Sequence, residues 1–377
     1  MKLFETEAKQ LLEEYGLVTP GFEADEYVVK AQVLAKNRKE NDGIKFASSR
    51  KEAEALASKI KARKVNGHEV NDVLIEEKTE FSQEYYIGVL YDTDVRSPVL
   101  LFSENGGTGV EDTKVQKLVL EDYNQWRIRE FLKNQDISSD QLVNLGKTIG
   151  KICECFFEQD ARMIEINPLV KTDSGYVVLD AMVDLEEDAS YRHSRDYEER
   201  SEFGRQKTER EIKAAEIDRD DHQGIAGKYT ELDGDIAMML AGGGASLSNM
   251  DALIEYSGEP ANYTEYGGNP PTEKVYKLSK IILSKPGLKG CWHVGGTANN
   301  TDIYRTMKGF CQALEEIKPE YPIVVRRDGP NADKAFELLR QTREKLDLDM
   351  KLYRNDTSMT QTANVLMDMI QQGESKQ

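Results

Sequence analysis

The chain has 377 residues, of which 31% are charged and 39% apolar, or about 46% apolar when glycine is included. This composition excludes a disordered chain, and the length predicts two or three domains. The formal net charge of −18 argues against a nucleic-acid partner, because binding a phosphate backbone depends on clustered lysine and arginine. No apolar run is long enough to cross a membrane and the first residues do not resemble a signal peptide, so we expect no membrane partner and a cytoplasmic location.

The periodicity of apolar residues in the first half predicts more strands than helices, and therefore an α+β domain. The predicted elements are helices over 2–16, 50–62 and 138–158, and strands over 28–35, 73–81, 83–92, 163–171 and 175–185, the last two forming a hairpin around the turn at 172–175.

The second half alternates short β-rich runs with helical patterns. The β-rich runs are DIAMMLA, ANYTEYGG, CWHVGG, IVVRRDGPN and KLYRND, beginning at residues 235, 261, 291, 323 and 351. Five strand-then-helix units predict an α/β domain with a doubly wound parallel sheet, in which ligands bind beyond the carboxyl ends of the strands.

A strongly charged segment separates the two patterns. Residues 185–222 contain 13 acidic and 8 basic side chains, which predicts a solvated connector or a surface helix. We therefore expect a first domain over 1–234, with a charged connector over about 185–234, and a second over 235–377. The four cysteines form no C-x-x-C pair and are predicted to be free, buried thiols.

The predicted hairpin carries polar side chains that suit a metal ion. Glu165 and Asn167 are two apart and share one face of their strand, and Asp180 returns on the partner strand. Carboxylate and amide oxygens are suitable Mg²⁺ ligands when phosphates and water complete the coordination. A surface hairpin with incidental acids is the alternative.

Lys30 interrupts an apolar strand, so its ammonium group needs an anionic partner, either a phosphate or a structural carboxylate. Arg38 follows in a polar loop that is poor in glycine, which is a weak signal for an anion-binding loop.

Two glycine-rich segments, AGGGAS at 241–246 and GGTANNTD at 295–302, precede predicted helices and offer backbone N–H groups to an anion. Thr301 or Asp302 could cap the second helix. Arg326 and Arg327 alternate faces at a strand end near the same edge, which favours a polycarboxylate or phosphate ligand. Surface arginines paired with local acids are the alternative.

Three features of the sequence carry a family resemblance: IEINPL followed by VVLDA, the segment VVKAQV, and the five strand–helix units. On these features nearly the whole chain resembles the β subunit of succinyl-CoA synthetase. The resemblance implies an ATP-grasp domain followed by a flavodoxin-like domain. The segments AGGGAS, ANYTEYGGNPP, GGTANNTD, VRRDGPN and DTSMT are more similar to ATP-citrate lyase and citryl-CoA synthetase. We therefore favour citrate as the substrate, with succinate, malate and other acids left open.

The resemblance implies a role for each matching residue. In the first domain these are Lys30 and Arg38 at the ATP phosphates, Glu76 and Thr79 at the adenine, Glu84 at the ribose or phosphates, Asn167 and Asp180 at Mg²⁺, and Glu165 beside a phosphohistidine. In the second they are Gly243, Gly244, Gly296, Thr297, Ala298, Asn299, Thr301 and Arg327 around the phosphate and carboxylate.

In this family the phosphohistidine and the CoA-binding domain lie on an α-type subunit or in a later region of a fused chain, and no histidine here fits that motif. The expectation is a hetero-oligomer that uses ATP and Mg²⁺, with CoA bound mainly by the partner. Three features depart from the family. KNRKE replaces a glycine-rich loop around Arg38, the stretch from Pro20 to Lys30 is short, and the citrate-type loop is one residue shorter, with Asn300 where an aromatic is common. A non-catalytic scaffold subunit is therefore a second hypothesis.

Overall fold

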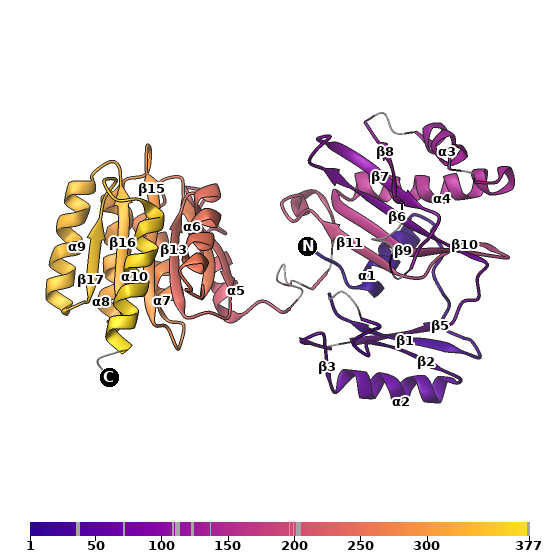
Figure 1. Cartoon of the computed structure of the whole chain (residues 1–377), viewed down its shortest axis with the longest axis horizontal. Coiled ribbons are helices and arrows are strands. Elements are labelled where there is room, and N and C mark those ends of the chain that lie inside the picture. Colours follow the sequence, from indigo (N-terminus) through magenta and orange to yellow (C-terminus); the bar gives the residue numbers. More distant parts are fainter. Residues whose placement is uncertain are drawn as a thin grey trace. The chain divides into compact units, whose positions relative to one another are not determined.

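The computed structural model divides the chain into two compact units, Met1–Gln206 and Lys207–Gln377 (Figure 1). The residues described are 1–374 except 35–37, 71, 108, 110–113, 122–123, 136, 196, 199 and 201–204. Each unit has its own hydrophobic core.

A small antiparallel sheet with the strand order β2–β1–β5 forms one part of the first unit. Its elements are β1 (Tyr27–Gln32), β2 (Ile44–Ala47), β5 (Asp72–Glu77), the covering helix α2 (Arg50–Lys61) and a short hairpin of β3 (Lys64–Val65) and β4 (His68–Glu69). Tyr27, Val29 and Ala31 alternate along β1 and pack in the core beneath α2. Lys30 therefore lies on the opposite face of the sheet.

A larger antiparallel sheet has the order β10–β9–β6–β7–β8, with β11 also paired to β9. Its strands are β6 (Gln83–Asp92), β7 (Ser97–Ser103), β8 (Gln116–Val119), β9 (Ala161–Thr172), β10 (Gly175–Val178) and β11 (Ala181–Leu185). Helices α1 (Glu5–Glu14) and α4 (Ser139–Glu158) pack on the sheet, and α3 (Gln125–Lys133) packs on α4 (Figure 1). The α+β prediction is confirmed, although β7, β8 and α3 had not been predicted.

The predicted hairpin is confirmed, with Gly175 opposite Thr172. Its return strand is interrupted between β10 and β11, where the Leu179 N–H donates to the Pro168 carbonyl at 3.1 Å. The Asn167 N–H donates to the Asp180 carbonyl, also at 3.1 Å, so the two predicted metal ligands are neighbours.

The second unit contains a six-stranded sheet in the order β12–β14–β13–β15–β16–β17. Its strands are β12 (Ile225–Glu231), β13 (Ile236–Ala241), β14 (Asn262–Gly267), β15 (Gly290–Thr297), β16 (Ile323–Asp328) and β17 (Met350–Tyr353). All but β12 are parallel, in the flavodoxin-like order 2-1-3-4-5, which confirms the doubly wound prediction. The switch point lies between β13 and β15.

Helices cover both faces of this sheet (Figure 1). The helices are α6 (Gly243–Glu255) and α10 (Met359–Glu374) on one face, and α7 (Thr272–Leu283), α8 (Ile303–Ile317) and α9 (Ala332–Leu346) on the other. Side chains of β13 alternate between the two cores, with Met238 packing in the core beneath α6 and α10 and Met239 in the core beneath α7 to α9.

The division between the units falls at 206/207 rather than at 234/235, because part of the charged segment folds onto the second sheet. Strand β12 pairs antiparallel with β14, and α5 (Glu209–Ala215) packs against β12. The charged side chains pair within this unit: Arg210 bonds Glu231 at 2.7 Å, and the buried Lys274 bonds Asp218 at 2.9 Å. Helix α5 therefore matches the surface-helix alternative, whereas β12, which falls within the expected connector over about 185–234, is part of the second sheet.

The four cysteines are free and buried, as predicted, and burial raises the pKa of the Cys153 thiol to about 12. Among the described residues, no helix combines the length and apolar character needed to cross a membrane.

Candidate functional site

Lys30 is buried and lies between two carboxylates. Its Nζ is 2.8 Å from Glu5 Oε1 and 2.5 Å from Glu76 Oε1, and it donates to the Leu179 carbonyl at 2.6 Å. Lys9 bonds the same two carboxylates, at 2.8 and 2.6 Å. Of the two partners that the sequence left open for Lys30, the structural carboxylate is the one present.

Arg38 joins this group to the hairpin. Its Nη2 lies 2.8 Å from Glu5 Oε2 and 2.9 and 2.7 Å from the two oxygens of Asp180. We call Glu5, Lys9, Lys30, Arg38, Glu76 and Asp180 the ion cluster. Its three cations and three anions balance, so phosphate can bind Arg38 only if the arginine leaves Asp180 or additional positive charge arrives.

The opposite charges of the ion cluster stabilise the ionised forms of its side chains. Burial alone would raise the pKa of Glu5, but Lys30, Lys9 and Arg38 hold this pKa well below its usual range. Burial alone would lower the pKa of Lys30, whereas Glu5 and Glu76 raise it. Both side chains are therefore charged at neutral pH.

Asn167 and Glu84 meet at Gly107. The Gly107 N–H donates to Asn167 Oδ1 at 2.5 Å, and Asn167 Nδ2 donates back to the Gly107 carbonyl at 3.3 Å. A Cβ at Gly107, where φ is +80°, would lie 3.0 Å from Glu84 Oε1. Glu165 is half-buried on the same face of β9 as Asn167, and the half-buried Thr79 follows β5.

Asn167 and Asp180 fit the chemistry of Mg²⁺, which accepts oxygen ligands from one or two protein groups. Within the described part of the chain, no three His, Cys, Asp or Glu side chains gather to form a metal cage. An ion at this site would need phosphate and water oxygens to complete its coordination.

The loops after β13 and β15 flank the switch point of the second sheet. Gly242, with φ +99°, precedes α6 and has no side chain to cap the helix, so the first N–H groups of α6 have no side-chain acceptor there. By contrast, the Asp302 carboxylate caps α8 by accepting from the Arg305 N–H at 3.1 Å. Of the two predicted anion-binding helix starts, only that of α6, with exposed Gly243 and Gly244, lacks a capping carboxylate.

The loop from Gly296 to Thr301 runs from the end of β15 to α8. Thr297 is opposite Asp328 of β16, and the Ala298 N–H donates to the Asp328 carbonyl at 2.9 Å. Asn299 is exposed and Thr301 half-buried. Asp302 rather than Thr301 is the cap of α8.

Arg326 and Arg327 lie on opposite faces of the sheet. Arg326 donates to the carbonyls of Thr357 and Gly295 at 3.0 and 2.9 Å. Arg327 is 3% exposed, donates to the Gly296 carbonyl at 3.3 Å, and stacks over the Tyr266 ring at 5.6 Å. Neither forms an ion pair with an acid in the described residues, so the alternative of surface arginines paired with local acids is wrong.

Asp328 and Arg354 tie β16 to the loop after β17. Their hydrogen bonds hold the pKa of Asp328 at about 2, from 3.8. This lowered pKa stabilises the fold above pH about 4, and the contribution disappears as pH falls towards 2.

We expect Asp328→Asn to lower the free energy of unfolding by about 1 kcal/mol at pH 7, allowing for the exposure of Arg354, and by nearly nothing at pH 2. Urea unfolding of both proteins across this pH range measures the difference, and a pH-independent cost would contradict the argument.

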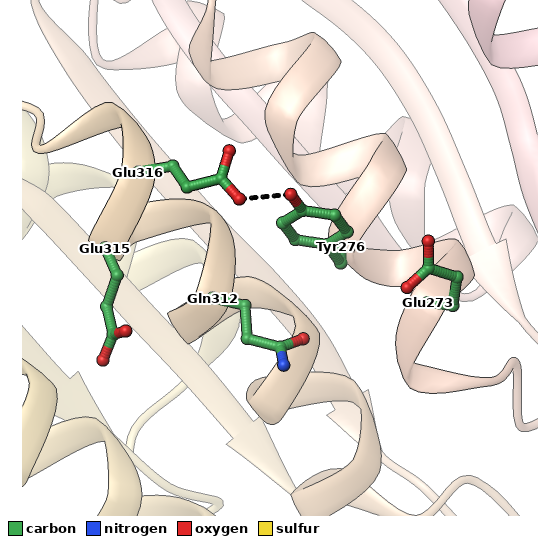
Figure 2. Close-up of a pocket in the computed structure, with 5 residues that line it drawn as sticks. All are labelled: Glu273, Tyr276, Gln312, Glu315 and Glu316. Atoms are coloured by element: carbon green, nitrogen blue, oxygen red, sulfur yellow. Dashed lines mark hydrogen bonds between the residues drawn. The ribbon is translucent and has the colours of Figure 1, made fainter.

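Two hollows lie on the outer surface of the helices of the second unit, and neither is lined by a residue of these loops. The one between α7 and α8 measures about 390 Å³ and is lined by Glu273, Tyr276, Gln312, Glu315 and Glu316 (Figure 2). Its acidic lining does not suit an anionic ligand. A second hollow of about 630 Å³ lies between α5 and α7, and neither contains a predicted site residue.

Comparison with known proteins agrees with this arrangement. An ATP-grasp domain family matches residues 18–171, and a family described as ATP citrate lyase citrate-binding matches residues 205–369. The succinate–CoA ligase [ADP-forming] β subunit of Rubrobacter xylanophilus is 30% identical over 368 residues, covering 90% of this chain and 93% of that protein. The chain belongs to the succinyl-CoA synthetase and ATP-citrate lyase family. It is a β-type subunit of an ATP-grasp CoA ligase.

Other family members support the assignment. The corresponding β subunit of Wolbachia is 31% identical over 381 residues, covering 91% of this chain and 94% of that protein. The structure of ATP citrate lyase from Methanothrix soehngenii, in complex with citrate and coenzyme A, superposes with a TM-score of 0.80 at 26% identity, covering 97% of this chain and 99% of that chain.

The predicted residues thus come together in part. The ion cluster contains Lys30, Arg38, Glu76 and Asp180. Gly107 hydrogen-bonds to Asn167 and lies next to the Glu84 carboxylate. Glu5 and Lys9 were not predicted as site residues, although their i,i+4 spacing on an amphipathic helix indicates that they pair. Tyr266 and His293 were not predicted as site residues either.

Proposed function

We propose that this chain is the nucleotide-binding subunit of an ATP-dependent ligase that joins citrate to CoA. The observation that carries the proposal is Arg327, a buried guanidinium with no acidic partner among the described residues, at the ligand edge of the sheet. Burying an unpaired cation is costly, and a substrate carboxylate would supply the missing anion. Arg327 also lies within residues 205–369, which match the citrate-binding family.

In the proposed arrangement the first unit binds ATP. Lys30 and Arg38 would contact the phosphates, Glu76, Thr79 and Glu84 the nucleoside side, and Asn167 and Asp180 would hold Mg²⁺. The metal would neutralise phosphate charge during phosphoryl transfer. Glu165 would steady a phosphohistidine supplied by an α-type partner.

The second unit would bind the acid. Arg327 would clamp one carboxylate, and the backbone of two loops would surround the rest through Gly243, Gly244, Gly296, Thr297, Ala298, Asn299 and Thr301. The phosphoryl group would pass from the histidine to a citrate carboxylate, and CoA, bound mainly by the partner, would displace it. The functional assembly would be a cytoplasmic hetero-oligomer.

Reconstitution tests the substrate. The chain with its α-type partner should form ADP and an acyl-CoA from ATP, CoA and citrate, and much less from succinate or malate. Activity with succinate alone would overturn the citrate proposal. That alternative has support from the curated β subunits, which are succinate–CoA ligases.

The neutral ion cluster favours a second candidate, a scaffold subunit that does not turn over nucleotide. Lys30 and Arg38 already have carboxylate partners at 2.5–2.8 Å, so neither cation is free for phosphate. Calorimetric titration with Mg-ATP distinguishes the two candidates, because a scaffold would give no binding heat.

Replacing Asp180 with alanine should weaken Mg-ATP binding at least about tenfold, because the proposed metal carboxylate is lost. Isothermal titration calorimetry with and without Mg²⁺ measures the effect. Asp173→Ala, at an exposed position of the same hairpin, is the matched control and should bind normally. Asp180→Ala also removes one of the two carboxylate partners of Arg38 and leaves Glu5. Tighter ATP binding by this variant would therefore show that Asp180 blocks the phosphate site and does not bind metal.

A further inference from the structure

Directly beneath Arg327 lies a buried tyrosine–histidine pair. Tyr266 is the penultimate residue of β14 and His293 is central in β15, and both are fully buried. The Tyr266 hydroxyl lies 2.7 Å from His293 Nε2, and their rings are 5.6 Å apart at 80°. The pair is thus fixed in distance and angle.

The surroundings of His293 are otherwise apolar. Its ring packs edge-on against Phe310 of α8, with centroids 4.6 Å apart, and its neighbours in β13 and β16 are Met239 and Val325. His293 Nδ1 is buried without a hydrogen-bond partner among the described residues. Burial, reinforced by the positive charge of Arg327, lowers the pKa of His293 well below its usual value, so the imidazole is neutral.

A neutral histidine in this position costs stability, since an apolar side chain would leave no unpaired buried atom. What it gains is a single hydrogen bond to Tyr266, the aromatic ring on which the Arg327 guanidinium stacks at 5.6 Å. Among the described residues, the guanidinium also interacts with the Tyr266 hydroxyl and donates to the Gly296 carbonyl, whereas its Nε has no partner. Tyr266 is therefore the main support of Arg327.

We infer that Tyr266 and His293 are positioning residues for the acid substrate. His293 holds the hydroxyl of Tyr266 in place by a hydrogen bond, and the Tyr266 ring orients the guanidinium of Arg327. The N–H groups of Arg327 then donate to a carboxylate of the substrate. The inference rests on the proposed function of Arg327 and extends it to two residues that would not touch the substrate.

The test uses the full chain and two variants, Tyr266→Phe and His293→Leu. Each should weaken citrate binding about 5–10-fold, the effect of one lost hydrogen bond, with unchanged affinity for Mg-ATP. His293→Leu should also leave the melting temperature unchanged or higher, an effect opposite to that of losing a structural residue. His293→Gln, which retains an acceptor for the Tyr266 hydroxyl, should recover part of the citrate affinity.

Tyr263→Phe is the matched control. It removes a hydroxyl from the same strand, which donates to Glu265 at 3.4 Å and not to His293, and should bind citrate normally. Calorimetry with citrate, succinate and malate separates the outcomes. If the unaltered chain binds citrate but both variants bind it equally well, the positioning role is overturned and the proposed function stands. If the unaltered chain binds none of the three acids, the proposed function fails, and the inference fails with it.

Discussion

Replacing Glu5 with glutamine should destabilise the first unit by about 3–5 kcal/mol, the cost of removing one partner from a buried ionic group. Glu5 is buried, and its two oxygens bond Lys9, Lys30 and Arg38 at 2.8 Å each. Glutamine keeps the shape of the side chain but leaves three cations facing only Glu76 and Asp180. Neither remaining carboxylate can reach all three cations as Glu5 does.

Hydrogen exchange on the full chain measures this effect in each unit separately. Exchange should accelerate in peptides from α1 and β1 and remain unchanged in the second unit. Glu14→Gln, on the exposed side of the same helix, is the control and should exchange like the unaltered chain. If Glu5→Gln matched the control, the ion cluster would contribute nothing to stability. Mg-ATP affinity in the same variant would then show whether Glu5 holds Lys30 and Arg38 for phosphate.

The ion cluster also shows what sequence patterns could and could not predict. The position of Lys30 in an apolar strand predicted an anionic partner for its ammonium group, and the carboxylates of Glu5 and Glu76 are such partners. The pattern could not show that the anion comes from α1, because pairing across 25 residues depends on how the helix packs on the sheet. The hairpin of β9 and β10 was predicted correctly because it depends on local spacing alone. In a strand, alternate residues lie on the same face.

Charge composition was a weaker guide than periodicity. Residues 185–222 were expected to form a solvated connector or a surface helix because so many of them are charged. Helix α5 lies in this segment and packs against β12, which follows the segment and pairs with the second sheet. Arg210, Asp218 and Glu231 find partners there, so the charges are neutralised within the unit. Five parallel strands were predicted from alternating runs, whereas an antiparallel edge strand of mixed polarity had no such signal.

Arg326 and Arg327 were expected to alternate faces at the end of their strand, and the structure places them on opposite faces of the sheet. This arrangement gives the second prediction. Arg327→Met should reduce citrate affinity by about 30-fold or more, because truncating one member of a buried charge pair costs about 2–5 kcal/mol of binding. The same variant should not lose folding stability without ligand, because it removes a buried cation that has no acidic partner among the described residues.

Arg326→Met should behave in the opposite way. It would leave the Thr357 and Gly295 carbonyls without their donors, so the free energy of unfolding should fall by about 1–3 kcal/mol. Citrate affinity should change far less than in Arg327→Met. Urea unfolding and citrate calorimetry measure stability and citrate affinity for both variants. The expected result is that Arg326→Met loses mainly stability and Arg327→Met loses mainly citrate affinity. If Arg327→Met destabilised the fold and left citrate binding intact, Arg327 would be a structural residue, and the acid would have to be bound by the loops at α6 and β15 alone.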